Sequence, residues 1–99
     1  MASRVAPQVE ADLDEIWLHT ARESGSLDVA NRLIDSITDR FCLLAGFPHA
    51  GRGRDLDLGV GVRSFPVGEH IIVYCVEGAD VLILRVVHGR RNMEKLFEQ

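Results

Sequence analysis

The chain has 99 residues, of which 46% are hydrophobic, and it carries a formal net charge of −4. These values fit one compact domain over residues 1–99, and they argue against a disordered chain or a protein that holds nucleic acid through a broad basic face. No apolar run approaches the ~20 residues that cross a bilayer, and the first residues lack the apolar segment of a secretion signal, so we expect a cytoplasmic protein without a membrane segment.

The first half of the chain predicts a short strand followed by a helix. Residues 3–5 could form the strand, and Pro7 suits the first turn of a helix, where its missing N–H would have no partner in any case. Beyond it, apolar residues recur at helical spacing, at Val9, Leu13, Ile16, Trp17 and Thr20. The acidic residues between them, Asp12, Asp14 and Glu15, are expected to face mostly away from this stripe.

A second helix is predicted directly after a break at Gly25. Ser26 is a plausible N-cap, and Gly46 is expected just beyond the end of the helix, with Pro48 following. The apolar stripe of this helix consists of Ala30, Leu33, Ile34, Ile37, Phe41 and Leu44. Because the link between the two helices is so short, they should pack as an antiparallel hairpin.

The second half of the chain predicts strands. Residues 49–61 form a loop rich in glycine and charge without a regular period. Three segments rich in β-branched and aromatic residues follow, separated by short turns, at residues 62–67, 70–77 and 81–88. Such strands are antiparallel neighbours, and Pro66, which has no N–H to donate, favours an edge position for the first of them. Residues 92–99 could form one helical turn.

The predicted architecture is therefore an α+β domain with the order β-α-α-β-β-β, in which a helical hairpin covers one face of a three-stranded antiparallel meander. The second and third strands of the meander are apolar on both faces. The face turned away from the helices must be covered by the rest of the chain or by a partner chain, and the sequence leaves these two alternatives open.

The residues with the strongest chemical potential lie at the end of the last strand, in "RVVHGRRN". His88 could act as a general acid or base, and a basic cluster at one end of the sheet could form from Arg63, Arg85, Arg90 and Arg91. The alternative is a solvated rim paired with nearby glutamates. No catalytic triad order, phosphate-binding loop or metal-ligand spacing is present, so we expect no cofactor and no metal.

Three segments of the chain are familiar as a set. "APQVEADLDEIW", "RSFPVGEHIIVYCVEGADVLILRVVHGRRN" and the terminal "LF" together resemble the ParE/RelE superfamily, the toxin halves of bacterial type II toxin–antitoxin modules. The most specific parts are the helix pattern around Asp12-Leu13 and Ile16-Trp17, Arg63 before the turn at residues 65–68, Tyr74, and Arg85-Val86 leading to His88-Gly89-Arg90-Arg91. The resemblance covers nearly the whole chain.

The resemblance implies the same β-α-α-β-β-β fold and a cognate antitoxin encoded beside the toxin. The C-terminal segment of such an antitoxin wraps across the helical hairpin and sheet, and an acidic segment would suit a basic strand end. Candidate residues for binding the antitoxin or the cellular target are Arg63, Tyr74, Arg85, His88, Arg90 and Arg91.

Two target classes divide the superfamily. RelE-like toxins are ribosome-dependent mRNA endoribonucleases, and ParE-like toxins act on DNA gyrase by protein–protein contact without hydrolysis. A ribonuclease would use Arg63, Arg85 and His88 here, but the chain has a single lysine and an acidic net charge, which suits ribosome docking poorly. We therefore expect a gyrase inhibitor that is not an enzyme and has no direct sequence-specific contact with nucleic acid. The alternatives are the ribonuclease and a degenerate toxin that only binds antitoxin.

Overall fold

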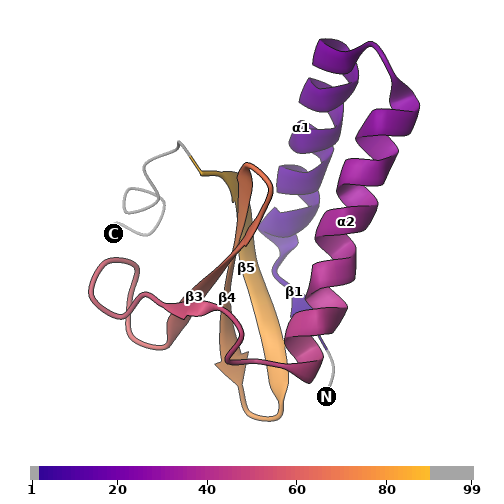
Figure 1. The fold of residues 1–99 in the computed structure, drawn as a ribbon. Helices are drawn as coiled ribbons and strands as arrows, with labels where there is room; N and C mark the ends of the chain where they lie inside the picture. Colours follow the sequence, from indigo (N-terminus) through magenta and orange to yellow (C-terminus); the bar gives the residue numbers. More distant parts are fainter. Residues whose placement is uncertain (1–2, 90–99) are drawn as a thin grey trace.

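The computed structural model describes residues 3–89 of the chain, and the element order confirms the predicted α+β architecture (Figure 1). Two helices form an antiparallel hairpin, α1 (Pro7–Ser24) and α2 (Leu27–Gly46). They pack against one five-stranded sheet made of β1 (Ser3–Val5), β2 (Arg52–Gly53), β3 (Val62–Val67), β4 (His70–Glu77) and β5 (Asp80–His88).

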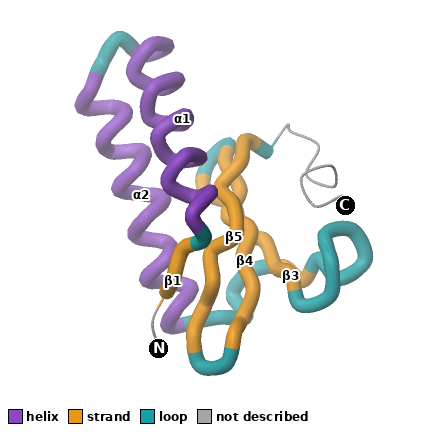
Figure 2. The backbone as a smooth tube through the Cα atoms, turned by 180° about the vertical axis from the view of Figure 1, so that it is seen from behind, coloured by secondary structure: helices purple, strands orange, loops and turns teal. Residues whose placement is uncertain are grey.

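The sheet has the strand order β1-β5-β4-β3-β2, and both helices lie on one of its faces (Figures 1 and 2). β1 runs parallel to β5, whereas the other neighbouring strands are antiparallel, which confirms the predicted meander. The core lies between the hairpin and this face. Its fully buried side chains include Val9, Ile37, Leu44, Ile72, Tyr74, Val81 and Ile83.

The helix ends agree with the predicted caps at one junction and differ at the other. Gly25 ends α1 in the left-handed conformation, with φ of 67°, and the Ser26 hydroxyl accepts a hydrogen bond of 3.2 Å from the Val29 N–H at the start of α2. Gly46 was expected beyond the end of α2 but forms part of its last turn. Phe47, with φ of −134°, leads the chain out in an extended conformation, so this helix end does not need the special freedom of glycine.

The loop predicted at residues 49–61 contains one element that the sequence did not indicate. β2 pairs with β3 at Arg63 and Ser64 only, which makes β3 the second strand from the edge and not the edge itself. At Pro66 the outer side of β3 carries no paired strand among the described residues. Pro66 therefore lies where no neighbouring strand needs its N–H, as predicted, although β3 is not the edge strand of the sheet.

The sheet face turned away from the helices is closed in part, since Ile71, Cys75 and Leu82 on it are half-buried. Val73 and Val87 on this face are buried, with exposed fractions of 0% and 2%. The loop between β2 and β3 lies on this side of the sheet (Figure 1), where Arg54 Nη1 donates a hydrogen bond to Ser64 Oγ and Leu58 is buried. Among the described residues, the chain itself thus supplies part of the cover that the sequence left open between self and partner.

Two predicted features lie outside the described residues, namely the turn at residues 92–99 and the positions of Arg90 and Arg91. Within the described part, neither helix is long and apolar enough to cross a membrane.

Candidate functional site

A β-bulge in β5 determines where the candidate residues of this strand lie. Tyr74 of β4 pairs with Ile83, but the next residue, Val73, pairs with Arg85, so Leu84 is extra. A bulge kinks its strand and re-aims the side chains beyond it. It also shifts the register by one residue, which places His88 directly opposite His70.

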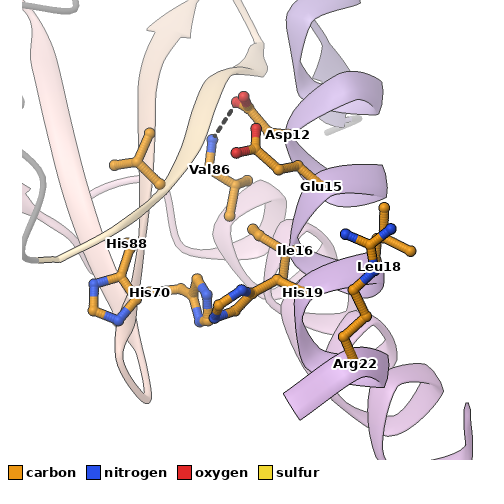
Figure 3. Close-up of a pocket in the computed structure, with 10 residues that line it drawn as sticks. Asp12, Glu15, Ile16, Leu18, His19, Arg22, His70, Val86 and His88 are labelled. Atoms are coloured by element: carbon orange, nitrogen blue, oxygen red, sulfur yellow. Dashed lines mark hydrogen bonds between the residues drawn. The ribbon is translucent and has the colours of Figure 1, made fainter.

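Arg85 is bound to a buried carboxylate on α1. Its Nε and Nη2 donate hydrogen bonds of 2.9 and 3.0 Å to the two oxygens of Asp12, whose side chain is only 4% exposed. The backbone N–H of Val86 donates a third bond, of 3.0 Å, to the same carboxylate (Figure 3). The hydrogen bonds to Asp12 raise the pKa of Arg85, against the opposing effect of burial. Asp12 was expected to face away from the apolar stripe, and this prediction is wrong because the residue faces β5.

The hydroxyl group of Tyr74 ties down the chain that follows α2. It donates a hydrogen bond of 2.7 Å to the Pro48 carbonyl and accepts one of 2.9 Å from the Gly51 N–H. The side chain is fully buried in the core. Tyr74 therefore presents no surface to a partner, and it serves as an anchor for the segment that leads into β2.

Arg63 anchors the same segment from β3. Its Nη2 donates hydrogen bonds of 3.2 and 2.6 Å to the carbonyl groups of His49 and Gly51. Two backbone carbonyls thus accept from one nitrogen of a guanidinium that was a candidate for binding a phosphate or a partner, and its Nε is buried without a hydrogen-bond partner among the described residues.

The predicted basic cluster at one end of the sheet does not form from the described residues. Arg63 pairs across the sheet with Tyr74, whereas His88 pairs with His70, four residues further along β4, or roughly 13 Å at ~3.3 Å per residue. Arg85 turns to α1. Arg63, Arg85 and His88 therefore do not converge on one point, as the three groups of a ribonuclease site would have to.

The surface that does concentrate chemistry is a cleft of about 480 Å³ between α1 and the adjoining ends of β4 and β5 (Figure 3). Its lining residues are Asp12, Glu15, Ile16, Leu18, His19, Arg22, His70, Val86, Val87 and His88. A second hollow beside it, of about 620 Å³, is lined by the same three histidines together with Glu23 and Glu69. We refer to these joined hollows as the histidine cleft.

The three imidazoles of the histidine cleft have different surroundings. His88 lies 3.6 Å from Glu69, and His19 lies 3.4 Å from Glu23, both through Nε2. The rings of His70 and His88 meet edge to face with centroids 5.4 Å apart. Burial lowers the pKa of His70, helped by the nearby His88 and His19, and its buried Nδ1 has no hydrogen-bond partner among the described residues.

Sequence reasoning singled out His88 but missed its two neighbours in the cleft. His19 follows Ile16 by three positions and so shares its helix face, which is a signal present in the sequence. The pairing of His70 with His88 depends on the bulge and could not be read from the strand pattern. No group of three histidine, cysteine or acidic side chains in the described residues is arranged to hold a metal ion.

The fold and the positions of the motif residues are those expected of a ParE/RelE-type toxin domain. Comparison with known proteins supports the same assignment. The family model "ParE toxin of type II toxin-antitoxin system, parDE" matches residues 4–93. The chain belongs to this family of toxins.

Two relatives from Caulobacter vibrioides are similar over most of their length. Toxin ParE3 is 36% identical over 85 residues, which cover 86% of this chain and 83% of the relative. Toxin ParE1 is 33% identical over 92 residues, which cover 90% of both chains. A solved structure titled "Chromosomal ParDE TA system from P. aeruginosa" superposes with a TM-score of 0.77 at 24% identity, over 89% of this chain and 95% of the other. This last likeness supports the fold alone.

Proposed function

We propose that this toxin inhibits DNA gyrase by protein–protein contact in the cytoplasm and that a cognate antitoxin holds it inactive. Membership of the ParE family supports the antitoxin partner, because the family consists of the toxins of parDE modules. The gyrase target is a more specific claim, and it is supported by the hydrogen bonds that the candidate cations Arg63 and Arg85 make within the domain.

The choice of gyrase over the ribosome rests on one observation, that Arg63 and Arg85 form hydrogen bonds within the domain. Cleavage of RNA through the 2′-hydroxyl needs a base, an acid for the leaving oxygen and cations around the phosphate. The two candidate cations are bound to backbone carbonyls and to Asp12, and His88 lies apart from Arg63 along the sheet. His88 itself lies in a cleft lined by several carboxylates, which would repel a phosphate backbone.

Two assays on one preparation distinguish the candidate targets. Purified toxin is added to gyrase in a supercoiling assay and to ribosomes programmed with mRNA in a cleavage assay. We expect loss of supercoiling, no new mRNA ends, and full reversal on addition of antitoxin. His88→Ala and the distant His49→Ala serve as a matched pair.

Cleavage of ribosome-bound mRNA that disappears in His88→Ala but persists in His49→Ala, with supercoiling unaffected, would favour the ribonuclease. If neither assay responds and expression without antitoxin is harmless, the chain is a degenerate toxin. An adjacent reading frame for a small DNA-binding protein is expected from the module and can be checked directly in the genome.

A further inference from the structure

Three of the four histidines of the chain meet in the histidine cleft although they lie far apart in the sequence. His19 comes from the C-terminal half of α1, His70 from the first position of β4 and His88 from the last position of β5. Figure 3 shows their side chains following one another along the cleft. Because imidazole titrates near neutral pH, this is the part of the described surface whose charge changes most between pH 7.5 and 5.5.

The other charged groups that face the imidazoles set the sign of this change. α1 contributes Glu15, Arg22 and Glu23, and the turn before β4 contributes Glu69. Asp12 also lines the cleft, but its charge is matched by the bound Arg85. α2 adds only the apolar Leu33. Counted over the described residues alone, with Arg85 included beside Asp12 and Glu15, four carboxylates and two guanidinium groups give a net charge of −2 when the imidazoles are neutral, and the sum becomes +1 when all three are protonated.

The cleft has an apolar floor where Ile16 and Val86, which are 9% and 2% exposed, line it. An apolar floor within an acidic rim is complementary to a segment that combines an apolar anchor with a basic neighbour. It is not complementary, at neutral pH, to the acidic segment that the sequence resemblance favoured. Charge thus selects among the segments that an antitoxin could place here.

We propose that the histidine cleft seats an apolar and basic segment of the antitoxin at neutral pH, and that protonation of His19, His70 and His88 weakens this binding. The inference rests on the proposed function and adds a regulation to it. Acidification shifts the toxin toward its free form, because protonated imidazoles in the cleft repel the basic segment that is docked there.

Two physical effects act in the same direction. A docked segment removes water from the imidazoles, and desolvation disfavours their charged form. A basic residue of the segment is in addition repelled by the imidazolium groups. If docking requires one imidazole that is protonated at pH 5.5 to lose its proton, affinity falls about tenfold between pH 7.5 and 5.5, and further if two or three must lose their protons.

The test measures the Kd of the toxin for its cognate antitoxin at pH 7.5 and 5.5 by isothermal titration calorimetry. The toxin is used as wild type, as the triple variant His19→Gln/His70→Gln/His88→Gln, and as His49→Gln, which changes the one histidine that does not line the cleft. Far-UV circular dichroism at both pH values establishes that each protein is folded. The quantity compared is the ratio of the two Kd values, and dividing the wild-type ratio by that of the triple variant removes the contribution of the antitoxin's own titrating groups.

We expect the wild type and His49→Gln to bind at least about tenfold more weakly at pH 5.5, and the triple variant to show a ratio of about threefold or less. An equal ratio in wild type and triple variant would overturn the inference. So would tighter binding by the wild type at pH 5.5, which would indicate an acidic segment in the cleft. Absence of binding at pH 7.5 would contradict the proposed function, and the inference with it, whereas binding without pH dependence contradicts the inference alone.

Discussion

Replacing Asp12 with alanine should lower the free energy of unfolding by about 3–5 kcal/mol, the range for breaking a buried ion pair. The carboxylate is 4% exposed and accepts three hydrogen bonds, two from Arg85 and one from the Val86 N–H. Its removal leaves a guanidinium that is only 18% exposed without its hydrogen-bonded carboxylate, with Glu15 as the remaining nearby acid, and it leaves the N–H of Val86 without an acceptor. Because the guanidinium keeps some contact with water, we expect the lower part of the range.

The measurement is urea unfolding of the free toxin followed by far-UV circular dichroism. For a domain of this size, ~1 kcal/mol corresponds to about 4–8 °C in Tm, so a loss of ~3 kcal/mol lowers Tm by roughly 12–24 °C. Glu77→Ala is the matched control, since it breaks the Arg4–Glu77 pair, whose side chains are 52% and 53% exposed. Such surface pairs contribute about 0–1 kcal/mol.

The reasoning is refuted if Asp12→Ala loses no more stability than Glu77→Ala. Should the alanine variant fail to fold, Asp12→Asn keeps an oxygen for the Val86 N–H and removes only the charge. The double variant Asp12→Leu/Arg85→Met is expected to lose less than the sum of its two single changes, because no charge remains buried without a partner.

Three further outcomes are expected from the same unfolding assay. Gly51→Ala should destabilise by about 1–3 kcal/mol, because a Cβ there would clash with the Tyr74 hydroxyl and lie 2.7 Å from a carbonyl oxygen, whereas Gly53→Ala, whose nearest neighbour would be 3.8 Å away, should change little. Tyr74→Phe should lose about 1–3 kcal/mol, since the Pro48 carbonyl and the Gly51 N–H each lose their partner. An effect equal to that of Gly53→Ala would contradict either expectation. Stability should also fall as pH drops through ~6.5, because the pKa of His70 is lower in the folded chain than the ordinary 6.5 and the unfolded chain therefore binds more protons. His70→Gln should weaken this dependence, and an unchanged slope would show that His70 does not cause it.

Periodicity was sufficient to predict the helices and the meander because each buries one regular face. It also contained the signal for Asp12, which was not used. Asp12 follows Val9 by three positions and precedes Ile16 by four, so it lies within the apolar stripe of α1, and an acid in such a stripe predicts a buried partner. The position of Asp12 within the stripe, more than its residue type, indicates that it packs against the sheet.

The remaining differences depend on contacts that no local pattern contains. β2 exists because Arg63 and Tyr74 hold the segment after Pro48 against β3, and these bonds join residues more than ten positions apart. The bulge at Leu84 is hidden inside a continuous apolar run. Without it, the turn between β4 and β5 would pair His70 with Val87 and not with His88, so the histidine cleft could not be predicted from sequence.

The residues that carry the family resemblance are mostly those that hold the domain together. Asp12 and Arg85 join α1 to β5, and Arg63 and Tyr74 join the sheet to the chain after α2. A motif made of such contacts predicts the fold well, because the contacts join its helices and strands. It discriminates poorly between gyrase and ribosome, because side chains engaged inside the domain are not available to a target. The residues that select the target must therefore be sought on the exposed surface, where Leu56 and Val60, 104% and 93% exposed, stand on a loop braced by the hydrogen bond from the Gly61 N–H to Asp55.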